Sequence, residues 1–313
     1  MTDLSLRYWG KAKPSKNGSA GWHLLPYHCL DVAACGVAYF RRASSLRRMF
    51  CARLGMTADQ LERWTGFWLA LHDLGKFATT FQGQRNDILL KLQGRESRHG
   101  YSIRHDTLGL VYWSVVLESE AVEEGWFGPD SAHLLPAIDY WVRAVTGHHG
   151  QPPSENEESP WPHFVSQDDR AIRQFVDQMR VLFLANMDWQ APCFADPYAF
   201  ENVTRGLSWW IAGLAVLADW VGSNQDYFPY RDDQVSCAEY WERALERAAT
   251  ACEAIGVLPP ETRQRATFFE LFPGLAQPSP LQAWASDAPL QAGPQIHRKR
   301  SVSSVLVRVA CRC

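Results

Sequence analysis

The chain has 313 residues, 46% of them hydrophobic and 12% aromatic, which is enough for one large globular domain or two of ordinary size. Its formal net charge of -3 gives no overall attraction to nucleic acid, so any contact with phosphate must depend on a local basic patch or on metal ions. The eight cysteines are scattered without a C-x-x-C pair, and neither a leader-like segment nor an apolar run of about 18 residues occurs, so we expect a reduced, cytoplasmic protein with no membrane partner.

The N-terminal forty residues predict an arm followed by a helix. Residues 1–20 contain Tyr8-Trp9-Gly10-Lys11 and a stretch rich in Gly, Ser and Lys, which is typical of an irregular surface segment. Residues 24–39 then carry apolar side chains at helical spacing, with Pro26 where a first helical turn tolerates it. This spacing puts His28 on the inward face. A lone histidine there is usually a core residue, so His28 is a candidate ligand only together with others.

Residues 57–77 form the most informative segment. Thr57 and Gln60 have the spacing of a capping box at a helix start. The apolar residues that then recur on one helix face are Leu61, Trp64, Trp68 and Leu71. His72, Asp73 and Lys76 follow beside this face at spacings that let their polar groups converge. Buried unpaired charge is costly, so these groups need partners, and a metal ion is the leading candidate. For this segment taken alone, a partly exposed His-Asp pair is the alternative, and the rest of the chain decides between the two.

The middle of the chain predicts two more helices that carry histidines. Residues 83–104 are polar and basic, which indicates either a solvated face or the local phosphate patch, and His105 begins the buried face of the next helix. Residues 119–130 predict an acidic loop, and Pro136 the start of a helix that leads to His148 and His149 and stops at Gly150. Two adjacent histidines at an inward-facing helix end are typical of metal ligands; one capping and one solvated histidine is the alternative.

The rest of the chain predicts a loop over residues 151–169, a helix over 170–188, a helix buried on nearly all sides over 201–221, and a last amphipathic helix over 237–255. Asp219 lies near the end of the buried helix, where a carboxylate needs compensation by an ion or by a structural hydrogen bond. The fold class is therefore all-α, a helical bundle over residues 1–255 with at most a small β-hairpin. Residues 256–313 are rich in Pro, Gly, Gln and Ser and predict an irregular, linker-like tail.

The candidate ligands come from five predicted helices and share one chemistry. They are His28, His72, Asp73, His105, His148, His149 and Asp219. Imidazole and carboxylate without thiolate suit iron, manganese, nickel, cobalt or zinc, and do not suit a structural cysteine-type zinc site. Seven ligands exceed the need of one ion, so we expect two divalent ions roughly 3.5–4 Å apart, bridged by Asp73.

This order of residues resembles the HD phosphohydrolase superfamily and, in detail, the HD nuclease domain of the CRISPR-associated helicase-nuclease of type I systems. The stretches that carry the resemblance are His28-Cys29-Leu30-Asp31, Leu71-His72-Asp73-Leu74-Gly75-Lys76-Phe77, Phe81-Gln82, Arg104-His105, Gly147-His148-His149-Gly150-Gln151-Pro152-Pro153 and Ala218-Asp219-Trp220-Val221-Gly222-Ser223. Together they cover roughly residues 5–255.

The resemblance implies a role for each residue. One ion is held by His28, His72, Asp73 and Asp219, and the second by Asp73, His105, His148 and His149. Lys76 faces the scissile phosphate, and Trp220 and Ser223 line the path of the substrate. The expected activity is metal-dependent cleavage of single-stranded DNA, as an endonuclease or exonuclease, in antiviral defence. The expected partners are a CRISPR RNA-guided surveillance complex and a helicase supplied elsewhere.

The tail resembles the beginning of the helicase half of the same family. Leu271-Phe272-Pro273 and Pro278-Ser279-Pro280-Leu281-Gln282 are similar to the glutamine motif that opens that half. No G-x-x-x-x-G-K-[ST] sequence occurs in the chain, so we expect no ATP site. The chain is then either a nuclease-only form that works with a separate helicase or a truncated or frame-altered product.

Two other functions fit the same residues. A nucleotide or cyclic-nucleotide phosphohydrolase would use the same ligand set, and a catalytically idle module would only dock a CRISPR surveillance complex. The complete ligand set argues against idleness, because a disused site has no physical need for so many buried polar groups.

Overall fold

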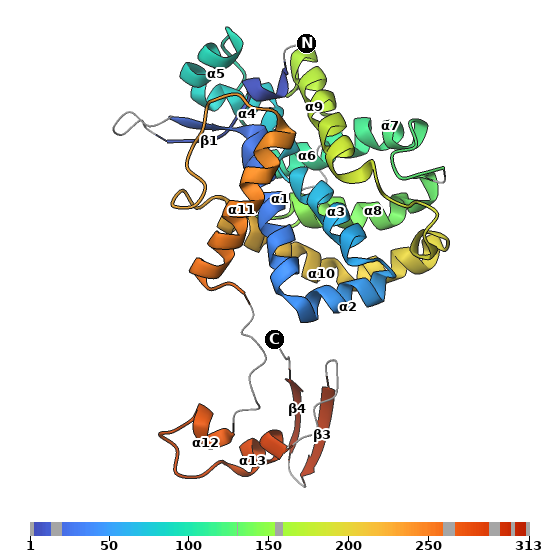
Figure 1. Ribbon diagram of the computed structural model, residues 1–313, viewed down its shortest axis with the longest axis vertical. Helices are drawn as coiled ribbons and strands as arrows, with labels where there is room; N and C mark the ends of the chain where they lie inside the picture. Colours follow the sequence, from blue (N-terminus) through green and yellow to red (C-terminus); the bar gives the residue numbers. More distant parts are fainter. Residues whose placement is uncertain are drawn as a thin grey trace. The chain divides into compact units, whose positions relative to one another are not determined.

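The structure, a computed structural model, describes residues 3–13, 21–129, 131–153, 159–258, 267–287, 295–301 and 304–310 (Figure 1). The chain divides into a first compact unit, Met1–Leu258, and a second, Pro259–Cys313. The all-α fold class is confirmed, because the first unit is built from helices and the described strands form only two antiparallel pairs.

Eleven α-helices are described in the first unit. They are α1 Leu25–Arg42, α2 Ser44–Leu54, α3 Ala58–Ala70, α4 Thr79–Gln82, α5 Asn86–Gln93, α6 His105–Tyr112, α7 Glu118–Glu123, α8 Ser131–Thr146, α9 Ser166–Met179, α10 Pro197–Gly222 and α11 Cys237–Ile255. Short 3-10 turns occur at Ser5–Arg7, Leu74–Phe77, Gly83–Arg85 and Pro192–Phe194, and π-helical turns at Trp113–Leu117 and Arg180–Leu184. The capping box predicted before α3 is present, with the side chains of Thr57 and Gln60 each accepting the other's backbone N–H.

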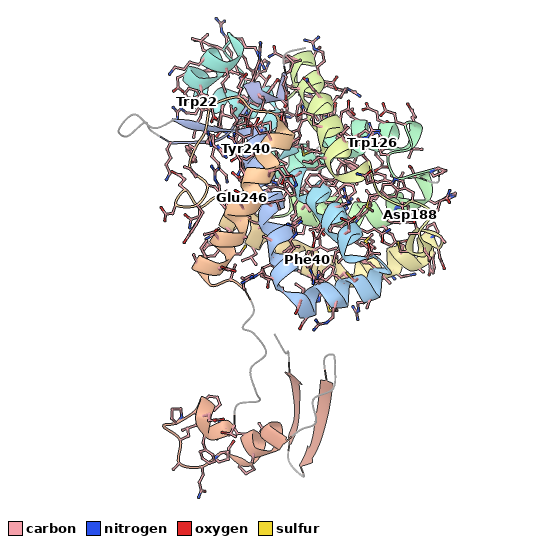
Figure 2. The ribbon with its side chains drawn as sticks, in the orientation of Figure 1. Trp22, Phe40, Trp126, Asp188, Tyr240 and Glu246 are labelled. Carbon is pink, nitrogen blue, oxygen red and sulfur yellow. The ribbon has the colours of Figure 1, made fainter. Side chains whose placement is uncertain are left out.

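Helix α1 is the central element, because it packs against α3, α10 and α11 and is buried along most of its length. Near its C-terminal end Phe40, labelled in Figure 2, meets Phe50 of α2 edge-on at a centroid distance of 5.0 Å. Near its start Tyr27 stacks on Tyr240 of α11 at 4.0 Å. Such aromatic pairs contribute about 0.5–1.5 kcal/mol each beyond the area they bury. They fix both ends of α1 and so fix His28, which follows Tyr27.

The predicted irregular arm is wrong for residues 9–12, which form strand β1 (Trp9–Ala12) antiparallel to β2 (Trp22–Leu24). The side chain of Gln82 accepts the N–H of Trp9 and donates to its C=O. A strand of this length is marginal alone. It is held by these contacts across more than seventy residues of sequence, which local composition does not reveal. The small hairpin that the fold class allowed is therefore present; residues 14–20 lie outside the described residues.

Three helix boundaries differ from the predictions. Helix α8 begins at Ser131 and not at Pro136, because the Ser131 hydroxyl accepts the N–H of Phe127 and donates to the C=O of Gly128 and so stabilises an earlier start. Helix α7 occupies part of the predicted loop 119–130. Helix α9 begins inside the predicted loop 151–169, where Asp168 accepts the N–H of Val165.

Helix α10 is not buried on nearly all sides, contrary to the prediction. One side packs against α1 and α8, whereas the opposite side exposes Trp209 (87%), Trp210 (50%) and Trp220 (59%). An apolar helix pattern indicates that a face can make hydrophobic contacts, but it does not show whether another part of the chain covers that face. Within the described part of the first unit nothing covers these indoles.

The second unit contains α12 (Phe268–Leu271), which begins with a capping box of Thr267 and Glu270, and α13 (Pro280–Asp287). Strands β3 (Gln295–Ser301) and β4 (Ser304–Ala310) form an antiparallel pair. Across the described ranges of both units, every helix is too short or too polar to traverse a lipid bilayer.

Candidate metal centre

Five segments bring the seven predicted ligands together. His28 lies on α1, His72 and Asp73 in the turn after α3, His105 at the first position of α6, His148 and His149 in the turn after α8, and Asp219 in the last turns of α10. The sequence placed His72 and Asp73 on a continuing helix, but α3 ends at Ala70. The chain then turns, because the N–H groups of His72 and Leu74 bond to carbonyls only three residues back.

Gly75 makes the close approach of two of these segments possible. A Cβ on Gly75 would collide with the carbonyl oxygen of His105 and lie 2.7 Å from the nitrogen of Gly109, both in α6. Only glycine fits between these backbones without a shift. The 3-10 turn therefore rests directly on the start of α6, which brings His105 to Asp73.

Asp73 lies between two groups of histidines. Its Oδ2 is 3.1 Å from Nε2 of His28 and 3.2 Å from Nε2 of His72. Its Oδ1 is 3.4 Å from Nε2 of His105 and 3.6 Å from Nε2 of His148. The side chain is fully buried. One carboxylate thus presents each of its oxygens to a different imidazole pair, which is the arrangement of a bridging ligand.

The first group consists of His28, His72 and Asp73, whose ligand atoms lie within 4.8 Å of one another. Asp219 completes it, with Oδ1 at 3.4 Å from Nε2 of His28 and 3.8 Å from Nε2 of His72. The geometry therefore assembles two imidazoles and two carboxylates around one point.

The second group consists of His105, His148 and His149, whose ligand atoms also lie within 4.8 Å of one another. Nε2 of His149 is 2.9 Å from Nε2 of His105. His148 is buried and His149 is exposed, so this group is the more open of the two. With Oδ1 of Asp73 it offers three imidazoles and one carboxylate.

The hydrogen bonds of His72 and His148 leave free the ring nitrogens that face the centre. Nδ1 of His72 lies 2.8 Å from the C=O of Leu69, and Nδ1 of His148 lies 2.9 Å from the C=O of Val145. A carbonyl only accepts, so Nδ1 carries the proton in both rings and the lone pair is on Nε2, which faces the centre.

Several buried polar atoms at this centre have no hydrogen-bond partner among the described residues. They are both ring nitrogens of His28, Nε2 of His72, Nε2 of His148 and Oδ1 of Asp73. An unsatisfied buried group costs about 1–3 kcal/mol, so a cluster of them is costly unless a ligand satisfies it. A neutral imidazole carries a proton on one ring nitrogen and a lone pair on the other, so His28, His72 and His148 each offer one lone pair beside the carboxylate of Asp73, and the residues fit divalent cations.

The protonation states also suit metal binding. Burial, with the nearby ammonium of Lys11, lowers the pKa of His28 to about 4, and burial lowers the pKa of His105 and of His148 to about 3. Burial alone would raise the pKa of Asp73, but the ammonium of Lys76 and the neighbouring imidazoles hold it well below its usual value. Neutral imidazoles and an ionised carboxylate are the forms that bind cations.

Two lysines neutralise the two carboxylates. The ammonium of Lys76 donates to Oδ2 of Asp73, and Nζ of Lys11 lies 3.6 Å from Oδ1 of Asp219. Burial is also opposed at Asp219, whose pKa is held below its usual value by the contact with the imidazole of His28 and by the charge of Lys11. The two lysine ammoniums therefore lie where the two carboxylates require positive charge.

One of the two predicted substrate contacts, Ser223, touches a candidate ligand. The hydroxyl of Ser223 donates to Oδ1 of Asp219 at 3.1 Å, so in this structure it holds a candidate ligand. The Trp220 side chain is 59% exposed and free to meet a substrate. Their contact with substrate stays a prediction.

Sequence reasoning missed three residues that shape the centre. Lys11 was placed in an irregular arm. Gln82 is buried and donates to the C=O of Lys76 at 2.7 Å, in addition to holding Trp9. The hydroxyl of Tyr101 lies 3.0 Å from Nδ1 of His105 and accepts its backbone N–H. Lys11 and Gln82 contact Asp219 and Trp9, which are far away in the sequence, so no spacing rule would have found these contacts. Tyr101 is only four residues from His105, but the segment between them is not helical.

Comparison with known proteins gives matches to one family. Residues 9–228 match the family model described as Cas3, HD domain. The CRISPR-associated endonuclease/helicase Cas3 of Escherichia coli (strain K12) is 27% identical over 274 residues, which cover 80% of this chain and 30% of that protein. The protein of the same description from Thermus thermophilus is 28% identical over 290 residues, 90% of this chain and 29% of its own.

The fold is also found in a solved structure of a separate domain. The crystal structure of the Thermus thermophilus cas3 HD domain in the presence of Ni2+ has a TM-score of 0.52 and 24% identity, and the match covers 84% of this chain and 96% of that one. This chain spans only about 30% of the length of the curated relatives that it matches.

Proposed function

The chain belongs to the Cas3 HD-domain family, and from this premise we propose that it is a divalent-metal-dependent phosphodiesterase that cuts single-stranded DNA in a type I CRISPR defence system. We assign the activity to the helical unit, residues 1–255, with the tail 256–313 as a linker. The observation that carries the proposal is the single buried carboxylate of Asp73, whose two oxygens face two separate imidazole pairs.

The proposed ligands are those that the geometry groups. His28, His72, Asp73 and Asp219 would hold one ion, and Asp73, His105, His148 and His149 the other. Two such ions, when bound, supply a water activated near neutral pH and stabilise the charge on the attacked phosphate and the leaving oxygen. The donor set suits manganese, iron, cobalt, nickel or zinc.

The chain's own residues would bind and orient the substrate. Lys76 is buried beside Asp73 and presents the nearest ammonium for the scissile phosphate. The exposed indole of Trp220 offers a stacking surface for a base without reading its identity. The more open His105, His148 and His149 group is the side by which a strand would approach.

The partners follow from the family and from the part of it that is present. The relatives are described as endonuclease/helicase proteins, and this chain matches about 30% of them. No phosphate-cradling G-x-x-x-x-G-K-[ST] sequence occurs in the chain. We therefore propose that a helicase activity outside residues 1–313 delivers the single strand, recruited by an RNA-guided surveillance complex.

The decisive experiment uses covalently closed single-stranded DNA with the purified chain in Mn2+, Ni2+ or Co2+. Linearisation and degradation of the circle, with intact duplex resistant, is the expected result, because a closed circle can only be entered by internal cleavage. Turnover of nucleotides or cyclic dinucleotides without action on the circle would show a phosphohydrolase. No turnover with any divalent ion would leave only the docking function.

A further inference from the structure

Strand β1 brings a second lysine to the rim of the metal centre. Nζ of Lys11 lies 3.6 Å from Oδ1 of Asp219, and its side chain keeps 27% of its surface exposed. The side chain of Lys76, in contrast, is only 6% exposed. Lys11 is therefore the ammonium of the two that a ligand arriving from solvent reaches first.

The position of Lys11 is built and does not depend on a flexible arm. The strand pairing shifts register between Trp9 and Lys11, and a β-bulge of this kind re-aims the side chain that follows it. The bulged residue is Gly10, where a Cβ would lie 3.0 Å from Cα of Leu25 and 3.2 Å from Cβ of His28. The strand thus passes directly over a candidate metal ligand, and glycine is favoured there because a Cβ would push its neighbours apart by a few tenths of an ångström.

One side chain ties both lysines to the same support. Gln82 accepts the N–H of Trp9, donates to the C=O of Trp9 and donates to the C=O of Lys76. Trp9 lies two residues before Lys11 on the strand. The backbone positions of Lys11 and Lys76 are therefore set by one buried amide, so the two ammoniums act from a common frame.

Metal binding would release Lys11 from its present partner. A divalent ion held by His28 and Asp219 would compete with Lys11 for the carboxylate of Asp219 and would repel its ammonium. Lys11 then needs a new anion within reach of the rim. A phosphodiester of the bound strand would supply one.

We propose that Lys11 forms a phosphate-binding site at the Asp219 side of the metal centre, which takes a phosphodiester of single-stranded DNA next to the one that is cut. The inference rests on the proposed function and extends it to a residue outside the ligand set. Lys76 contacts the phosphate that is cut and Lys11 contacts the neighbouring phosphate, so the strand is bound at two successive phosphates.

The test compares Lys11→Ala, Lys11→Arg and the control Lys13→Ala in steady-state cleavage of a single-stranded oligonucleotide with saturating Mn2+ over a range of salt. Lys13 follows the same strand and is exposed. We expect Lys11→Ala to raise KM roughly tenfold or more, because a hydrogen bond to a charged group is lost, with a smaller change in kcat. One phosphate contact fewer should reduce the salt slope of log KM by about 0.7. Lys11→Arg should largely restore both, and Lys13→Ala should match the wild type.

A second measurement separates phosphate binding from support of the ligands. Equilibrium dialysis against Mn2+ should give Lys11→Ala an occupancy no lower than that of the wild type. A wild-type KM and salt slope in Lys11→Ala, or a fall in its Mn2+ occupancy, would overturn the proposal. If the wild type cleaves no DNA, the proposed function fails first. Calorimetric titration of the Mn2+-loaded chain with inorganic phosphate still tests Lys11, and equal affinity in the wild type and Lys11→Ala would then overturn it.

Discussion

The contact between Asp73 and Lys76 allows the stability of the site to be separated from its chemistry. Asp73 is fully buried and Lys76 is 5% exposed. Asp73→Asn keeps the shape of the side chain but leaves the buried ammonium without its carboxylate. Removal of one partner of a buried ion pair costs about 3–5 kcal/mol. A unit of this size loses about 2–4 °C of melting temperature for each kcal/mol, so we expect the melting temperature of the metal-free chain to fall by about 6–20 °C.

The double variant Asp73→Asn/Lys76→Met supplies the contrast. Methionine removes the stranded charge and keeps an unbranched side chain, so most of the lost melting temperature should return. Cleavage should not return in either variant, because asparagine offers one neutral oxygen where a charged bridge between two ions is needed. We expect the cleavage activity to fall by more than about 100-fold. This exceeds the loss that is typical when a residue that only hydrogen-bonds to a metal ligand is mutated.

The assay is thermal unfolding followed by circular dichroism in EDTA, with cleavage of circular single-stranded DNA measured in Mn2+ on the same preparations. If metal-free Asp73→Asn melts at the same temperature as the metal-free wild type, the ion-pair argument is refuted. Recovery of cleavage in the double variant would refute the bridging role of Asp73.

Four further predictions follow from the same structure. Gly75→Ala should lower stability by about 1–3 kcal/mol or more and reduce Mn2+ binding, because its Cβ collides with α6, whereas Gly206→Ala on exposed helix surface should raise stability by about 0.5–1 kcal/mol; thermal melts and dialysis measure both. Mn2+ at 100 times its Kd should stabilise the chain by about 2.7 kcal/mol relative to the metal-free form, which is measured as a melting temperature that rises with Mn2+ concentration. The chain should neither bind nor hydrolyse ATP, in filter-binding and phosphate-release assays, with or without DNA. Trp220→Ala should weaken oligonucleotide binding by about 1–3 kcal/mol, while Trp209→Ala, on the same helix, should not, as fluorescence anisotropy can show.

Helical periodicity was sufficient to predict several helices of the first unit, among them α1, which carries His28. The apolar spacing over residues 237–255 coincides with α11, and the inward position of His28 follows from the spacing of α1. Periodicity describes each helix against its own axis. It therefore indicated which histidines face the core, and it was the mixture of residue types that pointed to one shared site.

The same reasoning could not see contacts made by turns. His72 and His148 lie just after their helices, and it is the contact of each Nδ1 with the carbonyl three residues back that aims Nε2 inward. Gln82 holds β1 across 73 residues of sequence, so the strand and Lys11 were read as an arm. The indoles of α10 show the remaining gap, because an apolar pattern cannot tell a face covered by the chain itself from one left open.

The charges at the centre explain why this ligand set can exist in a folded chain before ions bind. Asp73 and Asp219 contribute two negative charges, Lys76 and Lys11 contribute two positive charges, and the lowered pKa values of His28, His105 and His148 keep these imidazoles neutral. The sum of these charges is zero, which avoids the cost of burying isolated carboxylates. Two divalent ions would add four positive charges and displace both ammoniums, which then face outward toward a polyanion. Ion binding therefore converts the lysines from internal counter-ions into phosphate contacts, and a chain without them should hold metal at least as well but lose its grip on the strand.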